Sequence, residues 1–336
     1  MMTEISKNKP RRMPKGTRRR LVVGLLALLF LIPAAVWSQE VLYRPGQYTE
    51  SMMDGSRERS YILHLPPQYD SRNALALVLA FHGGGGSARQ LLDSCGLAAK
   101  ADKEGFILVV PNGTGKLRRR FLTWNVGFGF GYAMDNHIDD IGFVRKLIEK
   151  LQNHLRIDSK KIFATGISNG GILCHFLAGA LSDKIAAIAP VVASIGGKKE
   201  SSADYIYPSM PEEPVSVVAF NGLLDPRIPY QGGIQQKSVG KPVYVTAAED
   251  MHSFWVRANQ CRPRPEVKVN QRDQYKVITY SGGRHGSEVV QYVIFNQGHA
   301  WPGGKKPWAG ADPPSRTISA DDIMWDFFKD HPKSDN

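Results

Sequence analysis

The sequence predicts a single α/β domain whose central sheet is mostly parallel, with helices on both faces. Three observations support this fold class. Short apolar runs alternate with longer segments of helical spacing through most of the chain. Several of the apolar runs are continuous rather than alternating, as in strands that are buried on both faces. The composition, 42% hydrophobic and 22% charged, is that of a globular protein, and we expect the domain to span residues 39–336.

The expected strands are short apolar or alternating runs that often end at glycine, proline or asparagine. They cover residues 57–64, 74–81, 106–110, 161–167, 185–192, 215–220, 275–280 and 289–295. The expected helices carry apolar residues three and four positions apart. They cover residues 87–103, 139–155, 169–181, 246–259 and 320–331. Residues 112–136 are rich in glycine, asparagine and aromatic residues, and we expect them to form a long loop.

The first 38 residues have the pattern of a secretory signal peptide or an N-terminal anchor. Eight lysines and arginines precede an apolar run at residues 21–32, and Val36 and Ser38 occupy positions that a signal peptidase would read. The run is shorter than the roughly 20 residues of a membrane-spanning helix, which favours a cleaved signal over an anchor. We therefore expect a secreted or periplasmic protein, attached to the membrane only if residues 21–38 are retained.

The net charge of +12 comes largely from this leader, which contributes +7. The remaining +5 is a modest surplus, so the sequence gives little reason to expect a nucleic-acid partner. No His-Glu-x-x-His or Cys-x-x-Cys spacing is present, and we expect neither a metal nor another cofactor. The cysteines are Cys95, Cys174 and Cys261, so at least one thiol is unpaired in a monomer. The sequence leaves their pairing and the oligomeric state open.

The chain contains one Gly-x-Ser-x-Gly pattern, centred on Ser168. It lies where a strand-type run stops and a helix-type run starts, which is the position of a nucleophile elbow. Gly166 and Gly170 lack a Cβ, so the strand and the helix can approach each other around the turn. We expect Ser168 to be a nucleophile, with the backbone N–H of Asn169 facing a developing oxyanion. The alternative is an ordinary turn in which Ser168 only caps the helix.

Four glycines follow His82 directly after the apolar run at residues 74–81. In α/β-hydrolases a His-Gly-Gly loop after an early strand provides the second oxyanion donor, and glycine lets the backbone N–H reach the substrate. We expect Gly84 to be this donor, with Gly85 as the next choice. A phosphate-binding loop is disfavoured because the Lys-Ser/Thr pair of a P-loop is missing. A plain flexible loop remains the alternative.

Asp225 and His299 are the candidate acid and base. Each follows a late apolar run, and together with Ser168 they have the chain order Ser, Asp, His of an α/β-hydrolase triad. In these roles His299 takes the proton of Ser168, and Asp225 fixes the tautomer of the imidazole. The alternatives are a turn residue before proline for Asp225 and a surface-loop histidine for His299.

Several stretches of the chain together resemble a known family. They are residues 82–84, 139–143, 166–171, 221–225 and 298–304. The chain resembles the exported esterases grouped as poly(3-hydroxybutyrate) depolymerase-like enzymes and as feruloyl and acetylxylan esterases (carbohydrate esterase family 1), of the α/β-hydrolase superfamily. The resemblance implies a serine esterase that hydrolyses polyhydroxyalkanoate esters, or feruloyl or acetyl esters of polysaccharide, through an acyl-enzyme. Family members often have a cysteine pair near the C-terminal strands, and Cys261 matches only one half of it.

Trp124 and Trp301 are candidates for lining an acyl or sugar pocket, with ordinary packing as the alternative. The expected partner is an ester substrate, either polymeric or soluble. Two other functions stay open: a serine peptidase of the same fold, and a non-catalytic module that binds a polymer.

Overall fold

The computed structural model describes residues 43–117, 120–235 and 242–334. By its internal contacts the chain divides into residues 1–40 and a second unit, residues 41–336, and the described residues all belong to the second unit. The predicted leader, residues 1–38, lies outside the described residues. None of the helices in the described ranges combines the length and apolarity that a membrane crossing takes.

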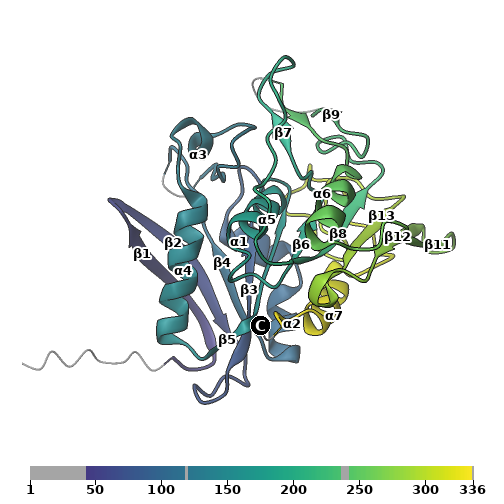
Figure 1. The fold of residues 1–336 in the computed structure, drawn as a ribbon. Helices are drawn as coiled ribbons and strands as arrows, with labels where there is room; N and C mark the ends of the chain where they lie inside the picture. The colour runs from purple at the N-terminus through teal and green to yellow at the C-terminus, as the bar shows by residue number, and fades with distance from the viewer. Residues whose placement is uncertain (1–42, 118–119, 236–241, 335–336) are drawn as a thin grey trace, which may run out of the picture. The chain divides into compact units, whose positions relative to one another are not determined.

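Within the described residues, a ten-stranded sheet has the order β1-β2-β4-β3-β5-β6-β8-β13-β12-β11 (Figure 1). The neighbours from β4 to β13 pair in parallel, whereas β1, β2, β12 and β11 extend the sheet in antiparallel pairings. This confirms the mostly parallel central sheet. The strands are β1 Gly46–Asp54, β2 Arg57–Leu65, β3 Leu75–Phe81, β4 Ile107–Pro111, β5 Ile157–Ile167, β6 Ala187–Val191, β8 Ser216–Gly222, β11 Glu266–Asn270, β12 Tyr275–Tyr280 and β13 Val289–Ile294. A small sheet joins β7 Gly197–Lys198, β10 Tyr244–Val245 and β9 Gly233–Ile234.

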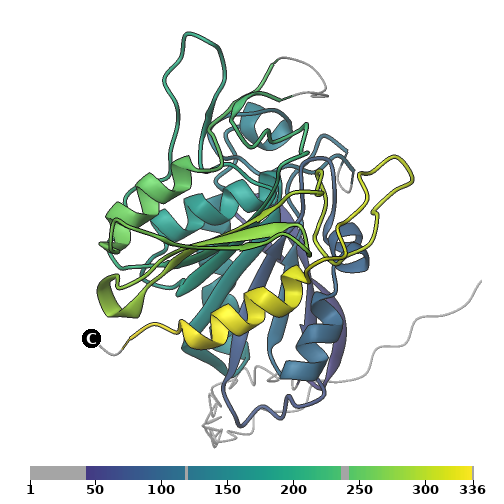
Figure 2. The same ribbon diagram turned by 90° about the vertical axis from the view of Figure 1, so that its right-hand side faces the viewer.

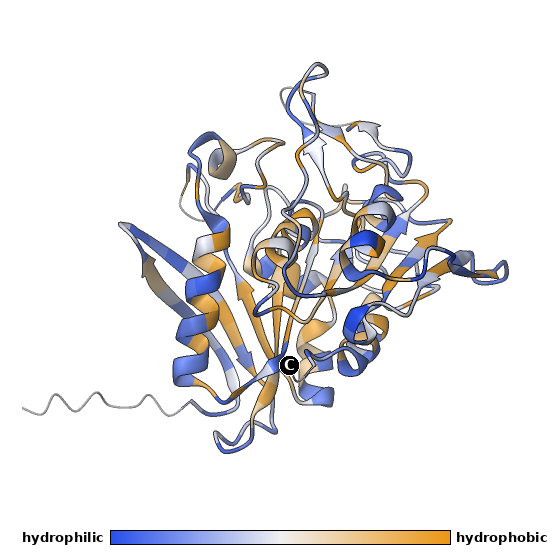
Figure 3. Ribbon diagram, viewed as in Figure 1, coloured by the Kyte–Doolittle hydropathy of each residue, from blue (hydrophilic) through white to orange (hydrophobic). Residues whose placement is uncertain are grey.

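Helices cover both faces of the central sheet, as predicted. In Figure 2, α7 lies on one side of the sheet, and α5 and α6 lie on the other. Alternate residues of β3 supply the two cores: Leu77 and Leu79 pack with α4, α5 and α6, whereas Val78 and Ala80 pack with α1, α2 and α7. The helices are α1 Ala88–Ser94, α2 Leu97–Glu104, α3 Tyr132–Asp135, α4 Asp140–His154, α5 Asn169–Ala180, α6 Asp250–Asn259 and α7 Ala320–Asp330, with a short 3-10 helix at Arg284–Gly286. The apolar colouring of the central strands in Figure 3 follows from this burial on both faces.

The structure differs from the predicted elements in several places. The single helix expected at residues 87–103 is two helices, because the chain turns at Gly96, whose N–H donates to Asp321 Oδ2 in α7 (3.0 Å). The edge strands β1 and β11 were not predicted, and the loop at residues 112–136 contains the short helix α3. The three cysteines are all unpaired, so the disulfide that family members often carry is not formed.

The loops that follow the parallel strands extend from one edge of the sheet, at the top of Figure 1, where α3, β7 and β9 also lie. The residues predicted to carry chemistry follow β3, β5, β8 and β13. In a parallel sheet the carboxyl ends of the strands share one edge, and this edge is where α/β proteins bind their ligands. The fold therefore gathers the candidate residues on one side of the molecule.

Candidate active site

Ser168 lies at the turn between β5 and α5. Its backbone has φ 56° and ψ −123°, which residues other than glycine rarely adopt. The Ser168 N–H donates to the carbonyl oxygen of Val191 at the end of β6 (2.9 Å), and the Ser168 carbonyl oxygen accepts from the N–H of Ile172 (2.8 Å). The side chain makes no capping bond to the helix. The alternative in which Ser168 serves only as a helix cap therefore does not hold.

Gly166 and Gly170 allow the strand and the helix to touch at this turn. A methyl group on Gly166 would lie 2.6 Å from the carbonyl oxygen of Gly170, and one on Gly170 would collide with the carbonyl oxygen of Phe81 in β3. Both obstacles are backbone atoms, which cannot rotate aside as the end of a side chain can. The start of α5 thus packs directly on β3 and β5, and this packing fixes the position of Ser168.

The glycine loop that follows β3 lies against the Ser168 turn. A methyl group on Gly83 would lie 3.4 Å from Cβ of Ser168, and one on Gly84 would lie 3.6 Å from Cβ of Asn169. The structure therefore brings Gly84, Asn169 and Ser168 together. Gly85, the second choice for an oxyanion donor, already donates its N–H to a carbonyl oxygen of the neighbouring loop (2.7 Å).

The buried imidazole of His82 fixes the orientation of the peptide between Gly83 and Gly84. His82 Nε2 accepts from the Gly113 N–H (3.0 Å), and His82 Nδ1 bonds the Gly83 carbonyl oxygen (2.8 Å). Burial lowers the pKa of His82 to about 4, so the ring is neutral, and Nδ1 carries the proton because Nε2 accepts. The Gly83 carbonyl oxygen also accepts from the Gly86 N–H (3.0 Å). Since C=O and N–H point in opposite directions in a trans peptide, the Gly84 N–H points away from these bonds.

Asn169 joins the Ser168 turn to the long loop at residues 112–136. Its Oδ1 accepts from the Trp124 N–H (2.8 Å), and its Nδ2 donates to the Trp124 carbonyl oxygen (3.1 Å). The side chain is therefore committed to the loop. The backbone N–H of Asn169 lies in the first turn of α5, where N–H groups have no partner within the helix.

The structure does not support a substrate-binding role for either tryptophan. Trp124 is fully buried, its indole N–H donates to the His82 carbonyl oxygen (2.9 Å), and its ring packs edge-on against Phe81. Trp301 is 2% exposed, and its indole N–H donates to Asp321 Oδ1 (3.0 Å). Buried rings whose N–H groups are satisfied stabilise the loops that carry the site and leave no face for a ligand.

Asp225 and His299 meet at the carboxyl ends of the neighbouring parallel strands β8 and β13. His299 Nδ1 lies 2.7 Å from Asp225 Oδ2, and the two side chains are 11% and 1% exposed. The other carboxylate oxygen, Oδ1, accepts from the N–H groups of Arg227 (2.8 Å) and Ile228 (2.9 Å). Asp225 is thus both a turn residue and the partner of His299. Because a carboxylate only accepts, His299 Nδ1 carries a proton, and in the neutral form of the ring the lone pair is on Nε2.

Further bonds hold the His299 loop in place. The Leu224 N–H, next to Asp225, donates to the Gln297 carbonyl oxygen (3.0 Å). The His299 N–H donates to Asp312 Oδ2 (2.8 Å), from the segment that leads to α7. Asp312 was not predicted, because no motif connects an aspartate 13 residues later with the backbone of His299.

Ser168 and His299 both lie at the edge formed by the carboxyl ends of the parallel strands, but they are not hydrogen-bonded to each other. Strands β6 and β8 separate β5 from β13, and among the described residues no hydrogen bond joins the Ser168 hydroxyl to His299 Nε2. In enzymes without a bound substrate the bond between nucleophile and base is often long or unformed. The structure therefore assembles two halves on one edge: Ser168 with the glycine loop, and His299 with Asp225.

A buried ion pair anchors the long loop near the site. Arg59 Nη2 lies 2.7 Å from Asp140 Oδ1, and these side chains are 1% and 0% exposed. Asp140 Oδ2 accepts from the N–H of Asn125 (2.8 Å), and the guanidinium lies 3.8 Å from the centre of the Phe143 ring. Burial raises the pKa of Asp140, whereas the Arg59 charge acts to lower it. The motif at residues 139–143 thus positions a loop.

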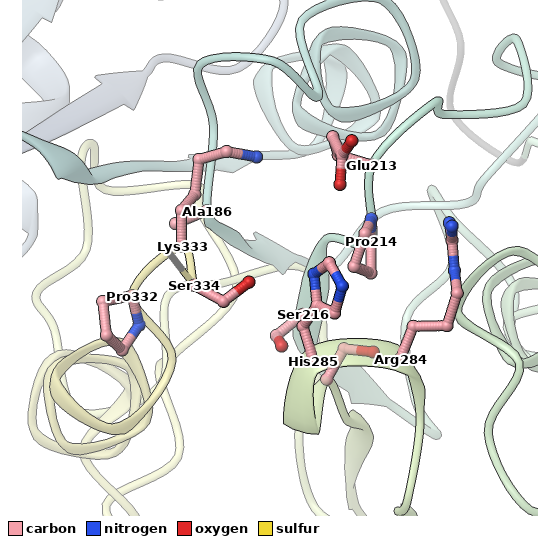
Figure 4. Close-up of a pocket in the computed structure, with 10 residues that line it drawn as sticks. Ala186, Glu213, Pro214, Ser216, Arg284, His285, Pro332, Lys333 and Ser334 are labelled. Atoms are coloured by element: carbon pink, nitrogen blue, oxygen red, sulfur yellow. The ribbon is translucent and has the colours of Figure 1, made fainter. Parts of the chain in front are cut away.

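A small pocket of about 50 Å³ lies elsewhere in the molecule (Figure 4). Its walls include Ser216, at the start of β8, and Arg284 and Lys333 from segments after β12 and α7. Ser216 marks the amino end of its strand, whereas Asp225 and His299 follow carboxyl ends. The pocket in Figure 4 is therefore separate from the candidate active site.

Several apolar side chains in the loops of this edge are exposed, and the sequence did not predict them. Among them are Phe121, Phe130, Leu223, Leu224 and Trp308, which are between 41% and 71% exposed. Phe121 borders a hollow of about 240 Å³ beside the glycine loop. For Phe130, the repeated Gly-Phe pattern at residues 127–131 was the available signal.

Comparisons with known proteins agree with this fold. No family model matches the chain. The chain is 27% identical over 257 residues to feruloyl esterase B of Piromyces equi, covering 74% of this chain and 44% of that protein. It is 24% identical over 332 residues to feruloyl esterase D of Neurospora crassa, covering 93% and 98%. These relatives are named as esterases, and the chain is a carboxylic ester hydrolase with an α/β-hydrolase fold.

Solved structures agree with the fold of this hydrolase. The acetyl xylan esterase from Aspergillus awamori matches with a TM-score of 0.55 and 13% identity, over 84% of this chain and 99% of that one. At this identity the likeness concerns the fold. The chain spans less than half the length of the Piromyces relative. The relatives are of the kind that the motifs of the sequence resemble, feruloyl and acetylxylan esterases.

Proposed function

We propose that this hydrolase is an exported serine esterase in which Ser168 is the nucleophile, His299 the base and Asp225 the acid that orients the base. The observation that carries the proposal is the Asp225–His299 pair. Its 2.7 Å contact lies at the same sheet edge to which β5 brings Ser168 in a strained backbone conformation. Strained residues that neighbouring structure holds in place are characteristic of catalytic turns.

In the first half of the reaction, neutral His299 takes the proton of the Ser168 hydroxyl through Nε2 as Oγ attacks the ester carbonyl carbon. Asp225 keeps the other ring proton on Nδ1 and stabilises the imidazolium that forms. The tetrahedral intermediate then collapses, and the alcohol leaves with the proton from His299. The product of this half is an ester between the acyl group and Ser168.

In the second half, a water molecule attacks the acyl-enzyme while His299 takes its proton. The tetrahedral intermediate collapses, Ser168 regains its proton, and the carboxylic acid leaves. In both halves the negative oxygen accepts from the backbone N–H groups of Gly84 and Asn169. The orientation of the Gly83–Gly84 peptide and the position of Asn169 at the start of α5 support this assignment.

The names of the relatives favour feruloyl or acetyl esters of polysaccharide as substrates. Polyhydroxyalkanoate esters, which the sequence motifs also allow, are the second substrate class. A panel of methyl ferulate, acetylated xylan, hydroxybutyrate oligomers and a neutral peptide separates these functions. We expect release of ferulate or acetate. Cleavage of the peptide alone would favour the serine peptidase, and binding of xylan without any turnover would favour the non-catalytic module.

Export is the remaining part of the proposal. The predicted signal peptidase positions, Val36 and Ser38, place the mature N-terminus at Gln39. N-terminal sequencing of the protein recovered outside the cytoplasm tests this. A chain that begins at Met1 and fractionates with membranes would instead favour an anchor.

A further inference from the structure

Phe130 is an exposed aromatic ring that lies against the glycine loop. A methyl group on Gly84 would lie 3.2 Å from Phe130 Cζ, 3.7 Å from Phe130 Cε2 and 3.6 Å from Asn169 Cβ. The Phe130 side chain is nevertheless 41% exposed. The ring is therefore next to Gly84, one of the two residues proposed to hold the oxyanion, and it remains open to a ligand.

The segment at residues 127–131 holds this ring in a defined place. Gly129 and Gly131, on either side of Phe130, have φ values of 93° and 103°, which only glycine adopts readily. Phe128, two positions earlier, is 2% exposed and belongs to the main core. One phenylalanine thus anchors the segment, while the other lies at the surface beside Gly84.

The orientation of the Gly84 N–H connects this ring to the substrate. The Gly83 carbonyl oxygen accepts from His82 and from Gly86, so the N–H of the same peptide points the other way. An ester whose carbonyl oxygen accepts from Gly84 and whose carbonyl carbon lies at Ser168 has its acyl group beside these residues. The Phe130 ring, which lies next to Gly84, borders the space that this acyl group would occupy.

We propose that Phe130 is a specificity-determining residue that contacts the acyl group and favours flat aromatic acyl groups over acetyl. The inference rests on the proposed function, because it requires the oxyanion to lie near Gly84. Aromatic rings in offset or edge-on contact gain more than the burial of their area alone provides. A hydroxycinnamoyl group can cover the exposed face of Phe130, whereas an acetyl group is too small to do so.

The test compares methyl ferulate with methyl acetate, which have the same leaving group and differ only in the acyl group. In Phe130→Ala, kcat/KM for methyl ferulate is expected to fall about tenfold, with methyl acetate changed less than about twofold. Phe130→Tyr keeps an aromatic face and is expected to retain the preference of the wild type.

Phe121→Ala is the matched control. Phe121 is 71% exposed and borders the hollow beside Gly85 and Gly86, but it is not among the nearest atoms to a methyl group on Gly84. This variant is expected to leave the ratio of the two kcat/KM values unchanged. Thermal unfolding of each variant checks that the fold is intact.

A second measurement does not depend on turnover. Binding of ferulate to Ser168→Ala, followed by calorimetry, is expected to weaken about tenfold when Phe130→Ala is added. The inference would be overturned if kcat/KM in Phe130→Ala fell equally for both esters, or if Phe121→Ala changed the ratio of the two kcat/KM values as much as Phe130→Ala does. It would also be overturned if the affinity for ferulate were the same with and without Phe130→Ala. If no ester is hydrolysed but ferulate binding depends on Phe130, the proposed function fails and the acyl contact stands.

Discussion

Replacing Asp225 with asparagine removes a charge and keeps the shape of the side chain. In the wild type, Oδ1 accepts from two backbone N–H groups, those of Arg227 and Ile228, while Oδ2 faces His299 Nδ1 at 2.7 Å. An amide has one oxygen and one NH₂ group. The two backbone donors hold the amide oxygen at the Oδ1 position, which puts the NH₂ group against His299. His299 Nδ1 must then accept, so the ring proton moves to Nε2.

A histidine that is protonated at Nε2 cannot take the proton of Ser168. We expect kcat of the Asp225→Asn variant to fall about 10⁴-fold, the size of effect known for this tautomer change in a serine protease triad. That loss corresponds to roughly 5 kcal/mol of transition-state stabilisation. Because both backbone bonds to Oδ1 are kept, the free energy of unfolding is expected to change by less than about 1 kcal/mol.

The assay is the hydrolysis of p-nitrophenyl acetate, with thermal unfolding measured on the same samples. Asp225→Ala is the matched control: it loses the contact to His299 and also leaves two backbone N–H groups without their acceptor. It is expected to be as inactive as Asp225→Asn and, in addition, less stable by about 1–3 kcal/mol. An Asp225→Asn variant that keeps more than about a tenth of wild-type kcat would refute the tautomer reasoning.

Three further predictions concern stability and positioning. Gly170→Ala places a methyl group against the backbone of β3 and is expected to lower the free energy of unfolding by about 3 kcal/mol; an unchanged urea midpoint would contradict that packing. Asp312→Ala removes the acceptor of the His299 N–H and is expected to lower kcat about tenfold with little change in KM; the idea fails if Asp312→Asn, which keeps an acceptor, is no more active than Asp312→Ala. Burial lowers the pKa of His175 from 6.5 to about 3, so the unfolded state takes up the proton first. The wild type should therefore lose about 3 kcal/mol more stability between pH 7 and pH 4 than His175→Gln, which keeps an acceptor for Trp255, and parallel stability curves would count against this.

The central strands could be predicted because burial on both faces leaves a continuous apolar run in the sequence. The edge strand β11, Glu266–Asn270, could not, since most of its residues are exposed and its pairing with β12 defines it. The break between α1 and α2 depends on the bond from Gly96 to Asp321, 225 residues away. A contact of that range leaves no local trace in either segment.

The residues of the candidate site also separate into those that the sequence predicts and those that it does not. Ser168 and the glycines after His82 belong to local patterns whose backbone needs are visible in the sequence. The sequence order suggested Asp225, and the structure brings its carboxylate to His299. The substrate-binding role predicted for Trp124 and Trp301 is not supported, because the sequence does not show whether an aromatic ring in a loop is buried or exposed. Phe130 was not predicted as a site residue for the same reason, since only the fold shows that its ring lies beside Gly84.

Covalent labelling can show whether Ser168 is the nucleophile of this hydrolase. Wild type and Ser168→Ala are each assayed with p-nitrophenyl acetate, then treated with a fluorophosphonate and mapped by peptide mass spectrometry. We expect turnover and one phosphonate adduct on Ser168 in the wild type, and the loss of both in the variant. Equal turnover in the two proteins, or an adduct on another residue, would contradict it.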